Sequence, residues 1–308
     1  MRFTLRQLQV FVAVAQHESV SKAAALLALS QSAASTAIAE LERQSSCQLF
    51  DRAGKRLSLN ALGHQLLPQA VALLDQAKEI EDLLGGKSGF GSLAVGATLT
   101  IGNYLATLLI GRYMQVHPES QVKLHVQNTA NIVHQVAQYE IDLGLIEGDC
   151  NHPDIEVQPW VEDELVVFCA PGHRLAQRGE ADHKALAEEA WILREQGSGT
   201  RLTFDQAMRH NRFNLNIRLE LEHTEAIKRA VESGLGIGCI SRLALRDAFR
   251  RGSLVPVATP GLDLARQFFF IWHKRKYQTS AMREFLELCR NFTAGAQRSD
   301  EIVLPSIA

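Results

Sequence analysis

The chain of 308 residues lacks most features of secreted, membrane-spanning or disulfide-linked proteins. No apolar run reaches the roughly 18 residues needed to cross a bilayer. Its first residues, MRFTLRQLQVF, lack the apolar block and small-residue cleavage site of a signal peptide. Its five cysteines form no Cys-x-x-Cys pair, which disfavours a disulfide framework or zinc site: Cys47, Cys150, Cys169, Cys239 and Cys289. We therefore expect a cytoplasmic protein with no membrane partner.

Motifs for catalysis or nucleotide binding are also missing. No serine or cysteine lies in a nucleophile elbow, and four histidines lack metal-ligand spacing: His173, His210, His223 and His273. The stretch GGKSGFG at 85–91 contains Gly-Lys-Ser, but a P-loop would need glycine where Glu81 stands. We predict no enzyme activity, no metal and no cofactor. The alternative to a protein without catalytic activity is an enzyme, or a small-anion binding protein, built on the α/β part of the chain after residue 90.

Charge is unevenly distributed although the formal net charge is only −2. Residues 1–60 carry seven Lys or Arg and four Asp or Glu, so the basic excess lies at the N-terminal end. A basic head on an acidic body is typical of a phosphate-binding module joined to a domain that does not bind DNA.

Residues 21–43, SKAAALLALSQSAASTAIAELER, predict two helices separated by a short turn. Ser21 is expected to cap the first helix, and Ser30 to cap a second helix that begins at Gln31. So short a turn makes the helices cross steeply, with small residues at their contact: Ala23, Ala24 and Ala33. This is the helix-turn-helix plan, in which the second helix presents its N-terminal residues to the DNA major groove. The alternative is an alanine-rich helical hairpin.

Short polar residues on the second helix suit contacts with bases and phosphates, while Ala34, Ala37, Ile38 and Leu41 face the domain. Thr4 and Gln7 predict a capping box for a supporting helix with Leu5, Leu8, Phe11, Val12 and Ala15 on one face. A turn at Gly54 predicts a two-stranded wing whose charged tip, Arg52, Lys55 and Arg56, lies beside DNA. Alternatively, these three charges belong to a hairpin that contacts only solvent. The DNA-binding residues expected are Arg2, Arg6, Ser21, Ser30, Gln31, Ser32, Ser35, Thr36, Arg52, Lys55 and Arg56.

A long helix is predicted from Ala61 to Leu84, capped by Asn60 and bent at Pro68. One apolar stripe contains Leu62, Leu66, Ala70, Leu73, Ala77, Ile80 and Leu84, and a second contains Leu67, Val71 and Leu74. So broad an apolar face favours a partner helix, most economically from a second copy of the chain in a homodimer. The alternative is that the stripe packs on its own body.

From residue 92 onward, strands and helices alternate, which predicts an α/β fold in two lobes with mostly parallel sheets. The expected strands are 93–97, 122–126, 141–146, 164–168, 215–221, 236–240, 254–257 and 267–273, and the expected helices are 101–116, 131–138, one after 200, 225–233 and 279–293. Segments 133–148 and 227–242 repeat one pattern, with Gly144 opposite Gly238. The expected domains are 1–60, 61–90 and 91–308, with lobe I at about 91–162 and 268–308 and lobe II at about 163–267.

Two such lobes usually bind a small ligand in the cleft between them. The loops at 98–103 and 194–201 place hydroxyl and backbone N–H groups at helix starts, which suits a small anion. Both could instead be ordinary capped helix starts. The effector-binding residues expected are Thr98, Leu99, Thr100, Ile101, Gly102, Glu147, Arg194, Ser198, Gly199 and Thr200.

The stretch LRQLQVFVAVAQHESVSKAAALLALSQSAASTAIAELERQ, with the later QLFDR and KRLSLNALG, closely resembles LysR-type transcriptional regulators. The resemblance implies a winged helix-turn-helix, a long dimerisation helix and a two-lobe, periplasmic-binding-protein-like (type 2) effector domain. It also implies a homodimer assembling to a homotetramer on a double-stranded DNA operator, with a co-inducer between the lobes. TIGNY, DLGLIEG and WILREQGSGTR most resemble the sulfite-responsive YeiE/FinR subgroup, so sulfite is the implied effector.

Glu147 ends the strand expected at 141–146 and should approach the same cleft. A carboxylate beside an anion is repulsive unless one of the two carries a proton. Sulfite is partly protonated near neutral pH and sulfate is not, so Glu147 could accept a hydrogen bond from bisulfite and disfavour sulfate. Alternatively, Glu147 pairs with Arg194 or Arg201 and never meets the ligand.

Overall fold

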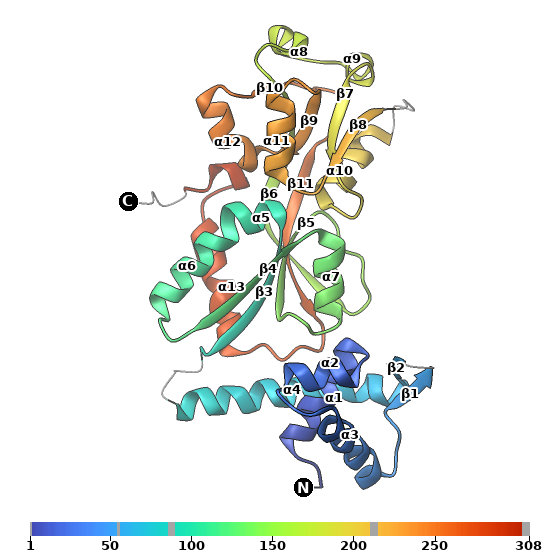
Figure 1. Cartoon of the computed structure of the whole chain (residues 1–308). Coiled ribbons are helices and arrows are strands. Elements are labelled where there is room, and N and C mark those ends of the chain that lie inside the picture. Colours follow the sequence, from blue (N-terminus) through green and yellow to red (C-terminus); the bar gives the residue numbers. More distant parts are fainter. Residues whose placement is uncertain (1, 54–55, 86–89, 210–214, 304–308) are drawn as a thin grey trace.

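The computed structural model describes residues 2–53, 56–85, 90–209 and 215–303, which form a helical head below a two-lobe body (Figure 1). Within these residues no single helix is long and apolar enough to cross a membrane, and α2 with α3 meets that test only as a pair bent by 109°. The body matches the expected α/β architecture, and the head matches the expected winged helix-turn-helix.

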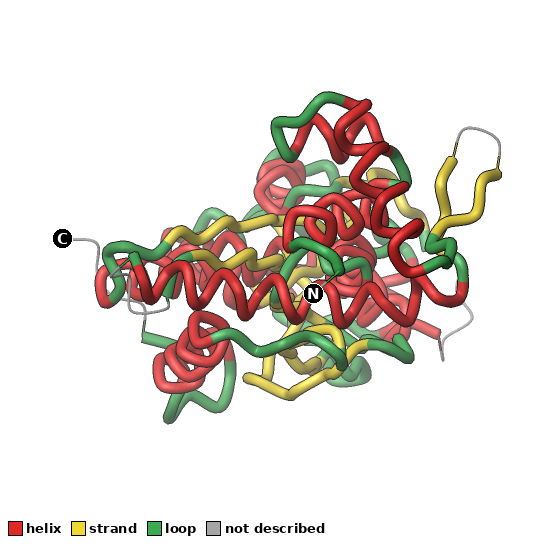
Figure 2. Tube along the Cα trace, turned by 90° about the horizontal axis from the view of Figure 1, so that it is seen from below, coloured by secondary structure: helices red, strands yellow, loops and turns green. Residues whose placement is uncertain are grey.

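The head consists of α1 (Leu5–His17), α2 (Val20–Leu26), α3 (Gln31–Ser45) and the wing strands β1 (Phe50–Ala53) and β2 (Arg56–Leu59). The 109° bend between α2 and α3 confirms the steep crossing. Phe11, Ala23, Ala34 and Ile38 share its core. Figure 2, seen from below, shows the wing protruding from the side of the helices.

Helix caps in the head confirm two predictions and correct one. Thr4 and Gln7 form the capping box, and Ser30 Oγ accepts a hydrogen bond from the Ala33 N–H at 3.1 Å. Ser21 is not a cap, because α2 begins at Val20, two residues earlier than expected, and Ser19 Oγ accepts from the Lys22 N–H at 3.3 Å. Two packing predictions were also wrong: Leu5 and Ala33 are exposed.

The linker helix α4 runs from Ala61 to Leu84 without interruption at Pro68, and Asn60 Oδ1 accepts from the Gly63 N–H at 2.9 Å as predicted. Its second stripe packs on the head, where Leu67 and Val71 are buried. Much of the first stripe stays exposed in the single chain: Leu62 at 44%, Leu73 at 37%, Ile80 at 58% and Leu84 at 83%. Packing on its own body therefore covers only part of the apolar face.

Lobe I contains the parallel strands β3 (Ser92–Thr98), β4 (Gln121–Gln127) and β5 (Leu143–Glu147). Its helical elements are α5 (Leu99–Ile101), the π-helix Gly102–Ala106, α6 (Thr107–Val116), α7 (Thr129–Ala137) and α13 (Ser280–Thr293). The predicted helix from 101 thus begins two residues earlier and contains a π-helical turn, a feature frequent at functional sites.

Lobe II contains β7 (Ala190–Arg194), β8 (Asn216–Leu221), β9 (Ile237–Ser241) and β10 (Val255–Val257). Its helices are α8 (Arg174–Arg178), α9 (His183–Ala187), α10 (Gly199–Met208), α11 (Thr224–Glu232) and α12 (Arg242–Arg251), and the 3-10 helix Ser299–Glu301 follows α13. Four of these elements were not predicted from the sequence: α8, α9, β7 and α12. The remaining predicted elements lie within a few residues of the observed ones.

Two long strands, β6 (Ile155–Cys169) and β11 (Ala265–His273), connect the lobes. The strand order is β4-β3-β5-β11-β6-β9-β7-β8, and β10 pairs with β6. The strand expected at 164–168 is only the second half of β6, so the expected lobe boundaries fall inside β6 and β11. These strands run antiparallel to their neighbours, and each sheet is therefore mixed rather than mostly parallel.

The repeated pattern is confirmed as a helix that leads into a strand, α7 into β5 and α11 into β9. The two glycines make close packing possible. A Cβ on Gly144 would lie 3.0 Å from Ile132 Cγ2 of α7, and one on Gly238 would lie 3.3 Å from Ile227 Cγ2 of α11. The repeat therefore reflects the same helix-on-strand packing in both lobes.

Candidate DNA interface and inter-lobe cleft

The N-terminal half of α3 presents the short polar residues expected to contact DNA. Gln31, Ser32, Ser35 and Thr36 are exposed, while Ala34 and Ile38 on the opposite side are buried. The hydroxyl groups of Ser30 and Ser32 form a hydrogen bond of 2.9 Å. The helix N-terminus thus combines free N–H groups with hydroxyl groups, an arrangement that suits phosphate and base contacts.

The other predicted DNA-binding residues lie around this helix in different settings. Arg2 and Ser21 are exposed, and Ser21 lies within α2. Arg6 Nη2 donates to the Leu27 carbonyl at 2.8 Å, so its guanidinium also holds the end of α2. Arg52 and Arg56 lie on the paired wing strands. Lys55 lies outside the described residues.

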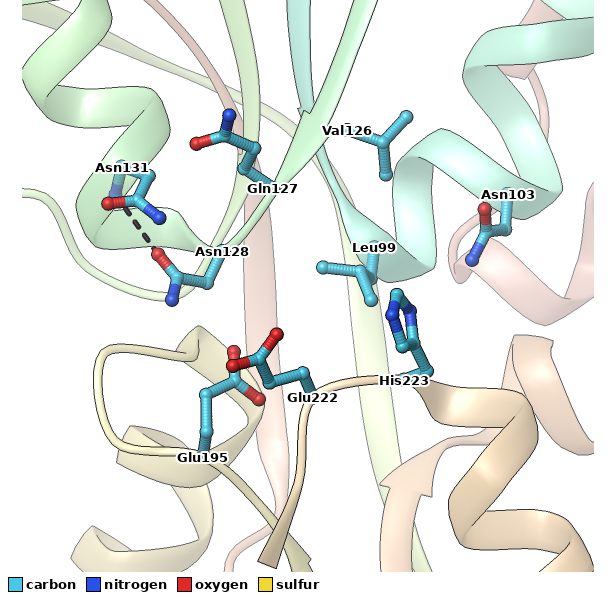
Figure 3. A pocket seen from close by; sticks show the side chains of 9 residues that line it. All are labelled: Leu99, Asn103, Val126, Gln127, Asn128, Asn131, Glu195, Glu222 and His223. Atoms are coloured by element: carbon cyan, nitrogen blue, oxygen red, sulfur yellow. Dashed lines mark hydrogen bonds between the residues drawn. The ribbon is translucent and has the colours of Figure 1, made fainter.

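A cavity of about 450 Å³ lies between the lobes (Figure 3). Lobe I contributes the end of β4 and the first turns of the helices that follow β3 and β4, and lobe II contributes two loops. The lining residues are Leu99, Asn103, Val126, Gln127, Asn128, Asn131, Glu195, Glu222 and His223. Its volume lies in the usual range for small-molecule sites.

Helix N-termini from both lobes reach this cleft. Thr98 is the N-cap of the helix that starts at Leu99, yet in the described structure its buried Oγ1 has no hydrogen-bond partner. Across the cleft, His223 is the N-cap residue of α11. Its side chain makes no capping hydrogen bond to this helix in the described structure. N-terminal N–H groups carry partial positive charge, so the two facing ends favour an anion.

The predicted lobe I loop only partly lines the cleft. Leu99 reaches it, whereas Thr98, Thr100, Ile101 and Gly102 are buried behind or beside it. A Cβ on Gly102 would lie 2.8 Å from Val126 Cγ1, so this turn packs closely on β4.

Of the predicted lobe II residues 198–200, Gly199 and Thr200 contact lobe I, and Ser198 caps a helix of its own lobe. The Gly199 N–H donates to Thr129 Oγ1 at 3.1 Å, and a Cβ on Gly199 would lie 2.0 Å from the Glu147 carbonyl oxygen. Ser198 Oγ caps α10 at 3.5 Å from the Arg201 nitrogen. We therefore correct the expected position of the anion: residues 198–200 close one flank of the cleft and do not line it.

Arg194 lies beside the cleft with its charge already paired. Its Nε and Nη2 donate to both carboxylate oxygens of Glu195, at 2.8 and 2.9 Å, and its side chain is only 1% exposed. Nη1 has no hydrogen-bond partner among the described residues. Glu195 therefore occupies two of the donor groups that the sequence analysis assigned to the anion.

Glu147 does not line the cavity, and its expected partners, Arg194 or Arg201, were wrong. Its Oε2 pairs with Arg266 Nη2 at 2.7 Å, and Arg266 Nε pairs with Asp163 at 2.7 Å. All three side chains are at most 2% exposed. Burial by itself lowers the pKa of Arg266, but the two carboxylates outweigh burial and raise it.

Thr200 joins this network from lobe II, because Arg266 Nη1 donates to its Oγ1 at 3.0 Å. The buried cluster therefore ties the lobes together where β6 and β11 cross. Arg266 was missed because a single arginine before the apolar run QFFFIW carries no motif. The stretches VQNTAN and LEHTE were missed too, although both place polar residues directly after a strand, in equivalent positions of the two lobes.

No group of three or more His, Cys, Asp or Glu side chains in the described parts of the chain is arranged to hold a metal ion. A helix-turn-helix head joined by a long helix to a two-lobe domain with a polar cleft defines a ligand-responsive DNA-binding regulator.

Comparison with known proteins supports this class. Residues 5–64 match the bacterial regulatory helix-turn-helix protein, lysR family, and residues 87–294 match the LysR substrate binding domain. The chain is 44% identical over 289 residues to the HTH-type transcriptional regulator YeiE of Escherichia coli K12, covering 94% of this chain and 98% of YeiE.

Two solved structures share the fold. A full-length variant of OxyR from Pseudomonas aeruginosa has a TM-score of 0.69 at 22% identity, with 94% of each chain covered. The CcmR regulatory domain of Synechocystis PCC6803 in complex with 2-PG has a TM-score of 0.63 at 29% identity, covering 67% of this chain and 99% of that one. The chain belongs to the LysR family of bacterial transcriptional regulators. It is a regulator and not an enzyme.

Proposed function

We propose that a small anion binds between the lobes and switches DNA binding or activation, and that sulfite is the first candidate. The observation that carries the proposal is the buried Thr98 hydroxyl, which has no hydrogen-bond partner in the described structure. Thr98 is the N-cap residue of the helix whose first residue, Leu99, lines the cleft. An anion at this helix start would accept hydrogen bonds from that hydroxyl and from the adjacent N–H groups. The uncapped start of α11 at His223 faces it.

The carboxylates of the cleft favour a protonated anion. Glu195 and Glu222 both line it, but Arg194 pairs with Glu195, so Glu222 is the carboxylate that repels a fully deprotonated anion. Bisulfite can donate its proton to one carboxylate, whereas sulfate cannot near neutral pH. Glu222 thus takes the role that the sequence analysis assigned to Glu147, because Glu147 is neutralised by Arg266.

An organic anion is the second candidate. The cavity of about 450 Å³ is larger than sulfite needs, and Asn103, Asn128 and Asn131 offer amide groups to further ligand atoms. The related CcmR domain was solved with 2-PG bound. A ligand of that kind would place its anionic group at Thr98 and its remaining atoms among the amides.

Isothermal titration calorimetry of the full chain with sulfite, sulfate and 2-PG tests both candidates. Thr98→Val should weaken binding of the preferred anion about tenfold, the value of one hydrogen bond of about 1.4 kcal/mol. Thr293→Val, in α13, is the matched control and should leave the affinity unchanged. Glu222→Gln should reduce the preference for sulfite over sulfate. An unchanged affinity in Thr98→Val would exclude this anion position.

We further propose that the protein works in the cytoplasm as a homodimer that assembles to a homotetramer on double-stranded DNA. The exposed residues of the first α4 stripe support a helix-helix contact between copies. The exposed residues Gln31, Ser32, Ser35 and Thr36 of α3 would read base edges, and the basic wing would contact phosphates or the minor groove. In vitro selection of duplexes from a random library by the full-length protein would identify the operator.

A further inference from the structure

The linker helix contacts lobe I through two partly exposed aspartates that pair with one buried lysine. Lys276, which follows β11, is 4% exposed, and its Nζ lies 2.7 Å from Asp75 of α4 and 2.7 Å from Asp142 of lobe I. Asp142 is itself held, because it accepts the Ala94 N–H at 2.8 Å. Burial lowers the pKa of Lys276, but the two aspartates outweigh it and raise the pKa, so the lysine stays charged.

Further contacts surround this cluster. Glu79 of α4 accepts Tyr277 Oη at 2.8 Å and the Ser280 N–H at 2.5 Å. In the head, Gln16 Nε2 donates to the carbonyl of Tyr139, whose hydroxyl contacts His273 Nδ1 at 2.8 Å. The same short segment after β11 therefore holds α4 and lies beside the contact with α1.

One pair of strands joins this contact to the inter-lobe network. β5 begins directly after Asp142 and ends at Glu147, and it pairs antiparallel with β11 from Gly144–Ile271 to Glu147–Phe268. At one end of the pair is the ion pair Glu147–Arg266, and at the other end is Asp142–Lys276. Five residues of strand span about 17 Å. Both ends of this hydrogen-bonded pair of strands are thus held by an ion pair with a buried cation.

We propose that the β5–β11 pair transmits movement of the lobes to the linker helix and that Lys276 is the positioning residue at which α4 receives it. A buried lysine cannot leave one carboxylate without uncovering a charge, so the contact holds α4 in discrete positions. By linkage, the coupling must also run from the DNA head back to the cleft. This reciprocity allows a test that does not depend on the identity of the effector.

The test is hydrogen exchange of the full-length protein, free and bound to a duplex selected from a random library. Binding of the duplex should change exchange at residues 195–201 at least twofold in the wild type, because Thr200 touches Arg266. Asp75→Asn should abolish that change while the duplex affinity stays within threefold. Asp75→Glu should retain it. Glu81→Gln, an exposed acidic residue on the same helix, is the matched control and should behave as the wild type.

Two results would overturn the proposal. One is a wild type in which the duplex leaves residues 195–201 unchanged. The other is an Asp75→Asn variant that still shows the change. Faster exchange at Ser280 in Asp75→Asn without the duplex, with exchange elsewhere in the effector domain unchanged, verifies that the variant has loosened the α4 contact and is otherwise folded. Failure of sulfite to bind affects none of these readouts, so the two proposals fail separately.

Discussion

Replacing Arg266 by methionine tests whether the buried cluster between the lobes is structural. Methionine has similar length and no charge, so Glu147 and Asp163 would face each other with no cation between them. Their side chains are 1% and 0% exposed, and water cannot compensate for the loss. Thr200 would also lose the donor that ties α10 to lobe I.

The expected magnitude follows from the degree of burial. Removing one partner of a buried ion pair costs about 3–5 kcal/mol. For an effector domain of this size, each kcal/mol lowers the melting temperature by roughly 2–4 °C, so the domain should melt roughly 6–20 °C lower. Glu147→Gln should cost less, about 1.5–3 kcal/mol, because Arg266 keeps its contact with Asp163.

Urea denaturation followed by circular dichroism measures these values. Arg250→Met is the matched control, because Arg250 pairs with Asp247 at 3.5 Å on the surface with both side chains about two-thirds exposed. Its loss should change stability by less than about 0.5 kcal/mol. An Arg266→Met variant within about 1 kcal/mol of the wild type would refute the structural role of the cluster. Altered sulfite selectivity in a fully stable Glu147→Gln variant would return Glu147 to the binding site.

Three further predictions address the head, the linker helix and the contact between head and body. Ser35→Glu places a negative charge at the DNA face and should abolish specific binding in gel-shift assays without changing the oligomeric state; normal affinity would contradict the recognition-helix assignment. Leu73→Asp should dissociate the dimer in analytical ultracentrifugation, because a buried unpaired charge is costly, and an intact dimer would place the seam elsewhere. Burial lowers the pKa of His273 in the folded protein below its ordinary value of about 6.5. Neutral His273 therefore contributes to stability above about pH 6.5, and this contribution is lost as the pH falls through the folded-state pKa. His273→Asn keeps an acceptor for Tyr139 and should reduce the extra loss of stability in urea between pH 7.5 and pH 5.5; an unchanged loss would rule out His273 as its source.

Local chemistry made much of the fold readable from the sequence. The caps at Thr4, Ser30 and Asn60 fix where helices begin, because their side chains bond to backbone groups three residues away. Spacing of apolar residues then assigned α1, α3 and α4, and the repeated glycines revealed the equivalence of the two lobes. Each of these features depends on residues close together in the chain. Ser21 failed because a neighbouring serine could cap equally well, and local pattern cannot choose between them.

Tertiary structure alone decided the partners of the charged and polar groups. Arg266 meets Glu147 across 119 positions of sequence, and Lys276 meets Asp75 across a still greater separation. No periodicity encodes such pairs, because they depend on where β6 and β11 cross between the lobes. The same crossing brings residues 198–200 against Glu147 and leaves Glu195, Glu222 and His223 to line the cleft. The sequence therefore determined most of the elements and the class of the protein, whereas the packing of the lobes decided which polar groups remain free for a ligand.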